Sequence, residues 1–424
     1  MLRLLGRGKL SSILTELVSS SRRPVLSRLG GWATSFSSYS SASSSLQPLW
    51  ADDEYADVNW DELGFSVVPT DYMYVMKCAR DDTFSSGRLN PYGNIELNPS
   101  SGVLNYGQVT SDHSMFIPVR LIHSSTLICT NLLLRTVQQG VFEGLKAYRK
   151  LDGCGFMLFR PVENATRMQM GADRMCMPSP SADQFIDAVK ETVLANRRWV
   201  PPQGKGSLYI RPLLIGSGTV LGLAPAPEYT FLVYAAPVGN YFKAREGMEP
   251  INLVVEDEVH RATPGGTGGV KTITNYAPVL KAQLLAKHNG FTDILYVDPV
   301  KKKYLEEASS SNIFIIKGNV ISTPATQGTI LAGITRRSII EIARDSGYMV
   351  EERLVAIEDL IDADEVFCTG TAVVVSPVGS VTYHGQRFEY RTGAETVSQR
   401  LYKSLTDIQM GLAEDTKGWT VEVA

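Results

Sequence analysis

The sequence predicts a two-domain protein of the α/β (or α+β) class that follows a short segment of different composition. The chain has 424 residues, which is more than one small domain needs. Apolar residues make up 44% and charged residues 20% of it, as in folded enzymes. Helix-like and strand-like runs alternate along its body. These observations exclude wholesale disorder, a collagen-like repeat and a coiled coil.

The composition also narrows the classes of partner. A net charge of -3 gives no chain-wide basic surface for nucleic acid. No apolar run reaches the roughly 18 residues of a membrane helix. The five cysteines form no CxxC pair, which favours reduced thiols. The histidines form no HExxH motif, so we expect no metal site.

Residues 1–50 differ from the rest of the chain. They are rich in serine, their arginines begin at Arg3, and Glu16 is their one acidic residue. This pattern is typical of an organellar transit peptide. We expect a mitochondrial protein, with the chloroplast as the alternative destination. A third possibility is a disordered tail that carries no targeting signal.

The elements of the body follow from hydrophobic periodicity and end signals. Ser181 and Gln184 form a capping box at the start of a helix. Further helices are expected at 277–289, closed by Asn289 and Gly290, and at 335–345 and 396–409. Runs rich in β-branched and aromatic residues predict strands at 208–214, 229–236, 251–255, 294–297, 365–368 and 373–375.

These elements predict a small N-terminal domain over residues 58–235 and a large C-terminal domain over 248–412. The stretch 236–247 is rich in small residues, glycine and proline, and it contains Tyr241. It therefore predicts the connection between the two domains.

A glycine-rich stretch at 265–269 precedes Lys271 without forming a nucleotide motif. The phosphate loop requires glycine directly before its lysine, and Val270 stands there. A lysine behind glycines can instead lie close to a ligand. A lysine that bonds covalently to an aldehyde cofactor must be available as a neutral amine, and Tyr276 could hydrogen-bond such a cofactor.

Two further features strengthen this interpretation. Glu307 stands between a strand-like run and the apolar 313–316 run, where a carboxylate needs a partner. Gly333 opens a helix whose first amides form an anion site. A lysine, a carboxylate for a ring nitrogen and a helix start for a phosphate are what pyridoxal 5'-phosphate requires.

Several segments in chain order then carry a resemblance. They are Phe142-Glu143-Gly144, Tyr209-Ile210-Arg211-Pro212, and residues 266–276, 307–314, 333–336 and 368–372. Together they resemble the branched-chain amino-acid aminotransferases of plant organelles, which are fold-type IV pyridoxal-phosphate enzymes. The resemblance covers roughly residues 58–412 and implies a two-domain fold with the cofactor between the domains.

The resemblance implies a role for each matching residue. Lys271 would hold the cofactor and move the proton at the substrate Cα. The other cofactor-binding residues would be Tyr276 at O3′, Glu307 at the ring nitrogen, and Arg167, Ile334, Thr335 and Thr371 at the phosphate. Arg174 is a rival to Arg167 for the phosphate.

The resemblance also implies the substrates. Arg211 would bind the distal carboxylate of glutamate or 2-oxoglutarate, and the Thr371–Ala372 turn would bind the substrate α-carboxylate. The other residues of the substrate site would be Tyr106, Phe142, Gly144, Tyr209 and Tyr241. The reaction implied is reversible transamination of leucine, isoleucine or valine with 2-oxoglutarate, carried out by a homodimer.

The sequence departs from the family at two places. Residues 109–139 are an insertion of 31 residues between Tyr106 and Phe142, which we interpret as a retained intron or a gene-model error, or alternatively as a genuine loop. Val373 and Ser376 stand where mammalian relatives have cysteines, so we expect no thiol switch there.

Three alternatives to this function remain open. The same fold would suit a D-amino-acid aminotransferase or an aminodeoxychorismate lyase. A relative could prefer methionine-derived oxo acids. The insertion could also make this chain a non-catalytic splice product.

Overall fold

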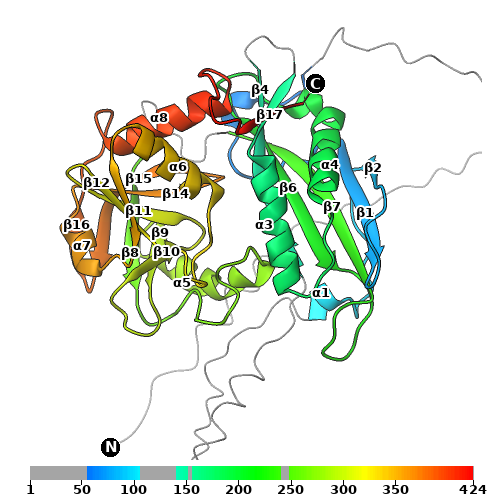
Figure 1. The fold of residues 1–424 in the computed structure, drawn as a ribbon, viewed down its shortest axis with the longest axis horizontal. Coiled ribbons are helices and arrows are strands. Elements are labelled where there is room, and N and C mark those ends of the chain that lie inside the picture. The colour runs from blue at the N-terminus through cyan, green and yellow to red at the C-terminus, as the bar shows by residue number, and fades with distance from the viewer. Residues whose placement is uncertain (1–54, 106–139, 151–154, 240–247, 424) are drawn as a thin grey trace, which may run out of the picture. The chain divides into compact units, whose positions relative to one another are not determined.

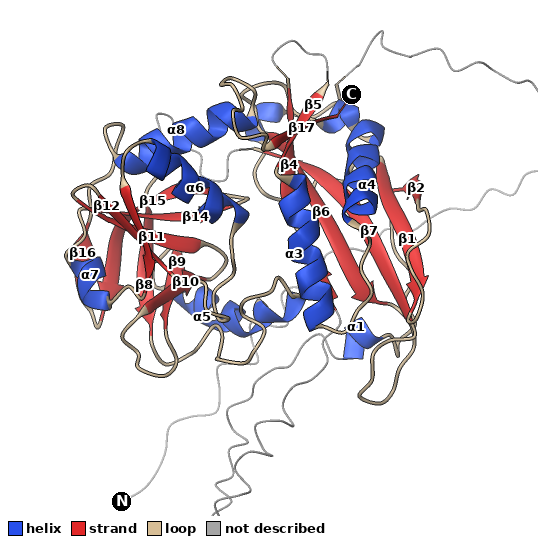
Figure 2. Ribbon diagram, viewed as in Figure 1, coloured by secondary structure: helices blue, strands red, loops and turns tan. Residues whose placement is uncertain are grey.

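The computed structural model describes residues 55–105, 140–150, 155–239 and 248–423. The predicted transit peptide, the predicted insertion at 109–139 and the predicted site residues Tyr106 and Tyr241 lie outside these residues. The described chain builds two lobes, each around its own β-sheet, as Figures 1 and 2 show.

The first lobe is an antiparallel sheet with two long helices packed on it. Its strand order is β17-β5-β4-β6-β7-β1-β2, and β3 also pairs with β6. The strands are β1 (Tyr72–Ala79), β2 (Arg88–Pro91), β3 (Gly140–Phe142), β4 (Leu145–Arg149), β5 (Phe156–Phe159), β6 (Ser207–Gly216), β7 (Glu228–Val238) and β17 (Thr420–Val423). The helical segments are η1 (Trp60–Glu62), α1 (Gly102–Asn105), α3 (Pro161–Arg174), α4 (Ala182–Ala195) and η3 (Arg197–Trp199).

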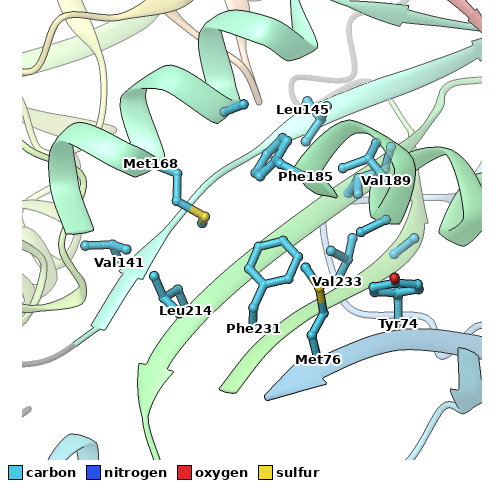
Figure 3. Close-up of a cluster of buried hydrophobic side chains, with 14 of the residues drawn as sticks. Tyr74, Met76, Val141, Leu145, Met168, Phe185, Val189, Leu214, Phe231 and Val233 are labelled. Atoms are coloured by element: carbon cyan, nitrogen blue, oxygen red, sulfur yellow. The ribbon is translucent and has the colours of Figure 1, made fainter. Parts of the chain in front are cut away.

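The core of this lobe lies between the sheet and helices α3 and α4. Phe185 and Val189 of α4 meet Phe231 and Val233 of β7, and Met168 of α3 joins them (Figure 3). The predicted capping box at the start of α4 is confirmed, because the Ser181 side chain and the Gln184 side chain each bond to the other's backbone amide. Burial of this apolar face, at about 25 cal/mol per Å², stabilises the lobe.

The second lobe is a mixed sheet that closes on itself. Its strand order is β10-β9-β8-β15-β14-β11-β12-β13, β16 pairs with β15, and β10 also pairs with β11. The strands are β8 (Ile251–Glu256), β9 (Asp293–Val297), β10 (Leu305–Ala308), β11 (Asn312–Lys317), β12 (Val320–Pro324), β13 (Met349–Arg353), β14 (Glu365–Gly370), β15 (Val374–Tyr383) and β16 (Gln386–Glu389). The closing pair is Glu307 opposite Asn312.

Helices flank this second sheet. They are η4 (Ile273–Asn275), α5 (Ala277–His288), α6 (Ile334–Asp345), α7 (Ile357–Ile361) and α8 (Val397–Gln409). The helices predicted at 277–289, 335–345 and 396–409 are confirmed, and so are the strands predicted in both lobes. The strand predicted at 373–375 is longer in the structure, because β15 pairs with β14, β8 and β16 along its length. The prediction of an α/β or α+β fold is confirmed.

The C-terminal segment returns to the first lobe. Beyond α8, strand β17 pairs antiparallel with β5. Next to this pair, the Arg160 guanidinium stacks 4.6 Å from the Trp419 ring centre. It also reaches α6, where its Nη1 atom donates to Ser338 Oγ at 3.0 Å and lies 3.3 Å from Glu341 Oε1. Arg160 is 2% exposed, so a buried charge joins the two lobes.

Within the described ranges, no helix is long and apolar enough to cross a membrane. The same ranges hold no cluster of three or more histidine, cysteine, aspartate or glutamate side chains suited to a metal ion. Cys78, Cys176 and Cys368 are free thiols, and Cys129 and Cys154 lie outside the described residues.

Candidate active site

Lys271 and Tyr276 lie together at the end of the glycine-rich loop. The Lys271 Nζ atom donates to the Tyr276 hydroxyl at 3.2 Å and lies 4.5 Å from the centre of the Phe142 ring. Asn275 fixes the loop, because its side-chain amide donates to the carbonyls of Thr267 and Val270, each at 2.8 Å. The short η4 turn therefore brings the lysine and the tyrosine to one point.

A cavity of about 550 Å³ opens at this pair. The predicted residues that line it come from both lobes and are Phe142, Gly144, Tyr209, Arg211, Lys271, Tyr276, Thr371 and Ala372. Eight other residues line the cavity and were not predicted as site residues: Phe65, Leu213, Tyr234, Ile273, Ser310, Ser311, Gly370 and Val373. Phe65 packs edge-on against Tyr209, with ring centres 5.1 Å apart. The positions of Leu213 and Tyr234 follow from the pairing of β6 with β7, which no local motif reveals.

Arg211 is a cation without an acidic partner in this cavity. Its Nη2 atom donates to the Tyr209 hydroxyl at 3.1 Å, and its guanidinium lies 4.7 Å from the Phe142 ring centre. Its buried Nε atom has no hydrogen-bond partner, and no described carboxylate forms an ion pair with it. A buried donor of this kind favours an anionic ligand.

Gly144 is required by the position of Tyr209. A Cβ atom at residue 144 would collide with the Tyr209 hydroxyl oxygen. The glycine thus allows the tyrosine to lie across β4 and to hold Arg211.

Arg167 marks a second cavity, of about 670 Å³, beside the glycine-rich loop. Ile334, Gly333 and Gly269 also line it. The Arg167 Nη1 atom donates to the Ala332 carbonyl at 3.1 Å, just before α6 begins. Gly333 provides no side-chain cap, so the first amides of α6 are available to an anion. Arg174, the rival, donates instead to the carbonyls of Gly265 and Gly266 and does not line this cavity.

Glu143 orients Arg167, and the sequence analysis missed this role. The Glu143 side chain is fully buried and accepts from Arg167 Nε at 2.7 Å and Nη2 at 2.8 Å. Asn164 also donates to it, at 2.6 Å. A charged residue inside the Phe-Glu-Gly strand segment was the available signal, since such a carboxylate needs a partner.

Glu307 lies at the closure of the second sheet and is 2% exposed. Its Oε1 atom lies 2.8 Å from Arg261 Nη1 and accepts from the Leu331 amide at 2.8 Å. Its Oε2 atom has a longer bond, 3.4 Å from Asn312 Nδ2, and retains capacity to accept. Burial raises the pKa of Glu307, and Arg261 together with the Leu331 amide opposes that rise.

The structure does not bring all the predicted phosphate residues together. Thr335 is buried in the first turn of α6, next to Ile334. Thr371 lies in the Lys271 cavity instead, where its hydroxyl donates to the Gly144 carbonyl at 3.1 Å.

These residues form a donor set that fits pyridoxal 5'-phosphate. Lys271 presents an amine, Tyr276 a hydroxyl and Glu307 a carboxylate oxygen with a free lone pair. Arg167 and the uncapped start of α6 present positive charge to a phosphate. This combination is the one that a class of amino-group transferases uses.

Comparison with known proteins agrees with this geometry. The profile of the family described as amino-transferase class IV matches residues 140–381. The chain therefore belongs to the class IV aminotransferases, and its cofactor is pyridoxal 5'-phosphate.

Its relatives define the branch of the class. The chain is 63% identical over 372 residues to a chloroplastic branched-chain amino acid aminotransferase of Humulus lupulus, an alignment that covers 88% of this chain and 83% of the relative. It is 58% identical over 370 residues to a mitochondrial one from the same plant, covering 87% and 86%. The chain belongs to the branched-chain amino-acid aminotransferases.

A solved structure shows the same fold. The crystal structure of the branched-chain amino acid aminotransferase of Escherichia coli superposes on this chain with a TM-score of 0.66. The two chains are 26% identical, and the match covers 84% of this chain and 100% of the bacterial one.

Proposed function

We propose that this chain transfers the amino group of leucine, isoleucine or valine to 2-oxoglutarate, reversibly, giving a branched 2-oxo acid and glutamate. One observation carries the proposal: a single cavity holds the Lys271–Tyr276 pair, aromatic walls and the Arg211 guanidinium without an acidic partner. Aromatic rings with polar tips accept a branched aliphatic side chain. The guanidinium donates hydrogen bonds to the distal carboxylate of glutamate or 2-oxoglutarate.

The chain's own residues would divide the work as follows. When bound, the cofactor would supply an electron-withdrawing ring that stabilises negative charge developing at the substrate Cα. The Lys271 amine removes the proton from the substrate Cα and later returns one. The Tyr276 hydroxyl, 3.2 Å from that amine, orients it. Backbone amides of the Thr371–Ala372 turn bind the substrate α-carboxylate.

The remaining residues would hold the cofactor from its two ends. Glu307 keeps the ring nitrogen protonated, because Arg261 and the Leu331 amide favour its charged form. Arg167, held by Glu143, and the amides of Ile334 and Thr335 bind the phosphate. Both lobes are therefore needed for a complete site.

The first test is a visible spectrum of the purified chain with pyridoxal phosphate, before and after leucine is added. We expect an absorbance band that shifts with leucine, and no such band in a Lys271→Ala variant. A Lys271→Ala variant with the same leucine-sensitive band would overturn the assignment of Lys271.

The second test concerns 2-oxoglutarate. An Arg211→Gln variant should lose about 100-fold in kcat/KM for 2-oxoglutarate, since a charge-assisted bond to a carboxylate is removed. Its reaction with leucine, measured as a single half-reaction, should change by less than about threefold. Equal losses for both substrates would show that Arg211 is only structural. The same assay with a methionine-derived oxo acid ranks that alternative substrate against the branched ones.

The insertion at 109–139 is proposed to impair this chain. On its two sides, Ser101 is bridged to Thr219, which follows β6, and Gly140 is paired with Ile215 near the end of β6. A short loop would therefore be enough to join these two segments. Lengthening that loop by 31 residues costs little loop-closure entropy, so the fold itself should tolerate the insertion. The impairment would arise because the insertion adjoins Phe142 of the substrate cavity. Equal specific activity with and without residues 109–139 would refute it.

Two further proposals concern assembly and location. Leu280, Leu284 and Leu285 on α5 are exposed, and an apolar helix face of this kind supports the proposed homodimer. A Leu284→Lys variant should shift the mass measured by light scattering from dimer to monomer.

The relatives are named chloroplastic and mitochondrial, so we propose an organellar enzyme. Residues 1–50 fused to a fluorescent protein should enter one of these two organelles.

A further inference from the structure

Two hydrogen bonds tie the Thr371–Ala372 turn to the other lobe, one to Gly144 just before β4 and one to Lys146 within β4. The Thr371 hydroxyl donates to the Gly144 carbonyl at 3.1 Å. The Lys146 Nζ atom donates to the Ala372 carbonyl at 3.0 Å. Gly144 contacts the turn through its backbone carbonyl, and Lys146, two residues later, contacts it through its side chain.

Lys146 approaches the turn from the side opposite to the substrate. Ala372 and Val373 line the Lys271 cavity, from which Lys146 is absent. The same two residues also line a separate cavity of about 100 Å³, which Lys146, Tyr148 and Tyr402 share. The turn is thus a thin wall between the two cavities.

The direction of the peptide group follows from this arrangement. In a planar trans peptide the carbonyl and the next N–H point in opposite directions. Because the Ala372 carbonyl faces Lys146, the Val373 N–H faces the Lys271 cavity. It is therefore a donor aimed at the place where the substrate α-carboxylate would lie.

The backbone just after the turn is strained and must be fixed by its surroundings. Val374 is buried and has a φ of 59°, a left-handed conformation that is strained for a β-branched residue. Such strain persists only where the surroundings fix the backbone. Val374 is held by its pairing with Gly370 of β14, and the preceding turn is held by the bonds to Gly144 and Lys146.

Lys146 is costly as a purely structural residue. No described carboxylate forms an ion pair with it, and burial lowers the pKa of Lys146 to about 8. Tyr148 and Tyr402 are the other titratable groups of its cavity, and burial raises the pKa of each. Burying an ammonium without an anionic partner destabilises the fold. The presence of Lys146 here is therefore better explained by a role in the site.

We propose that Lys146 is a positioning residue for the substrate α-carboxylate. Its ammonium holds the Ala372 carbonyl and so turns the Val373 N–H toward the substrate. This inference rests on the proposed function, because it assumes that the turn binds an α-carboxylate.

The test compares two ligands that differ only in the carboxylate. The probes are 4-methylpentanoic acid and its neutral amide, titrated into the pyridoxal-phosphate enzyme and followed by the cofactor absorbance. A Lys146→Met variant should bind the acid about tenfold more weakly and the amide within about twofold of the unchanged enzyme. A Lys146→Arg variant should recover most of the affinity for the acid. Pyridoxal phosphate itself should bind all variants equally.

Lys150→Met is the matched control, because the Lys150 ammonium pairs with Glu422 away from the turn. It should bind both probes as the unchanged enzyme does. Equal losses for acid and amide in Lys146→Met, or no loss for either, would overturn the inference. If Lys146→Met does not fold, Lys146→Gln decides by the same comparison. Failure of the unchanged enzyme to react with leucine would instead refute the proposed function.

Discussion

Replacing Glu143 with glutamine tests how the phosphate-binding arginine is held. Glu143 accepts three strong bonds, two from Arg167 at 2.7 and 2.8 Å and one from Asn164 at 2.6 Å. A glutamine keeps one acceptor oxygen. Its side-chain NH2 group replaces the other oxygen and would face an N–H donor of Arg167 or Asn164, with which it cannot form a hydrogen bond. Two charge-assisted bonds are lost, at about 1.5–3 kcal/mol each. The expected loss in the free energy of unfolding is about 3–5 kcal/mol, as for other broken buried ion pairs.

Cofactor should reduce this loss, because a bound phosphate gives Arg167 a new anionic partner. Urea denaturation of Glu143→Gln should therefore show a larger defect in the cofactor-free protein than in the loaded one. Glu422→Gln removes an exposed partner of Lys150 and should cost at most about 1 kcal/mol in both forms. A defect in Glu143→Gln below about 1 kcal/mol, or one equal in both forms, would refute the reasoning.

Three other changes follow from contacts of the site and its supports. Gly144→Ala should lower kcat/KM for leucine about 100-fold by displacing Tyr209, whereas Gly64→Ala, with open space around it, should be neutral; equal kinetics for the two would contradict this. Arg160→Gln should lower the free energy of unfolding, measured by urea denaturation, by about 2–3 kcal/mol. It should also weaken cofactor binding, because Arg160 contacts α6, and Arg160→Lys should be less affected. An unchanged urea midpoint would count against this prediction. Burial raises the pKa of Cys368 to about 12, so peptide mapping after alkylation at about pH 8 should find it roughly a thousandfold slower than exposed Cys176; similar rates would show that the thiol is accessible.

The parts of the site that are close in sequence were predictable. Lys271 and Tyr276 are joined by a single short turn, and the helix start at Gly333 has its own sequence signature. The expected helices and strands also agree with the structure, because their apolar spacing matches their buried faces.

The supporting contacts were not predictable from local patterns. Glu143 meets Arg167 across a strand and a helix, and Lys146 meets Ala372 across more than two hundred residues. Such pairs depend on the pairing of whole strands and on the approach of one lobe to the other. Glu143, like Glu307, stands next to apolar residues, and its need for a buried partner follows from the same argument.

The return of β17 to the first lobe has a consequence for synthesis. Strand β5 has β4 on one side, and its other edge is covered by residues 420–423. Those residues follow the second lobe in the chain, so the first sheet keeps an open edge until the whole second lobe has been made. An unpaired edge invites pairing with other chains. The edge of β5 in the growing protein therefore has to be shielded from other chains until β17 has been made.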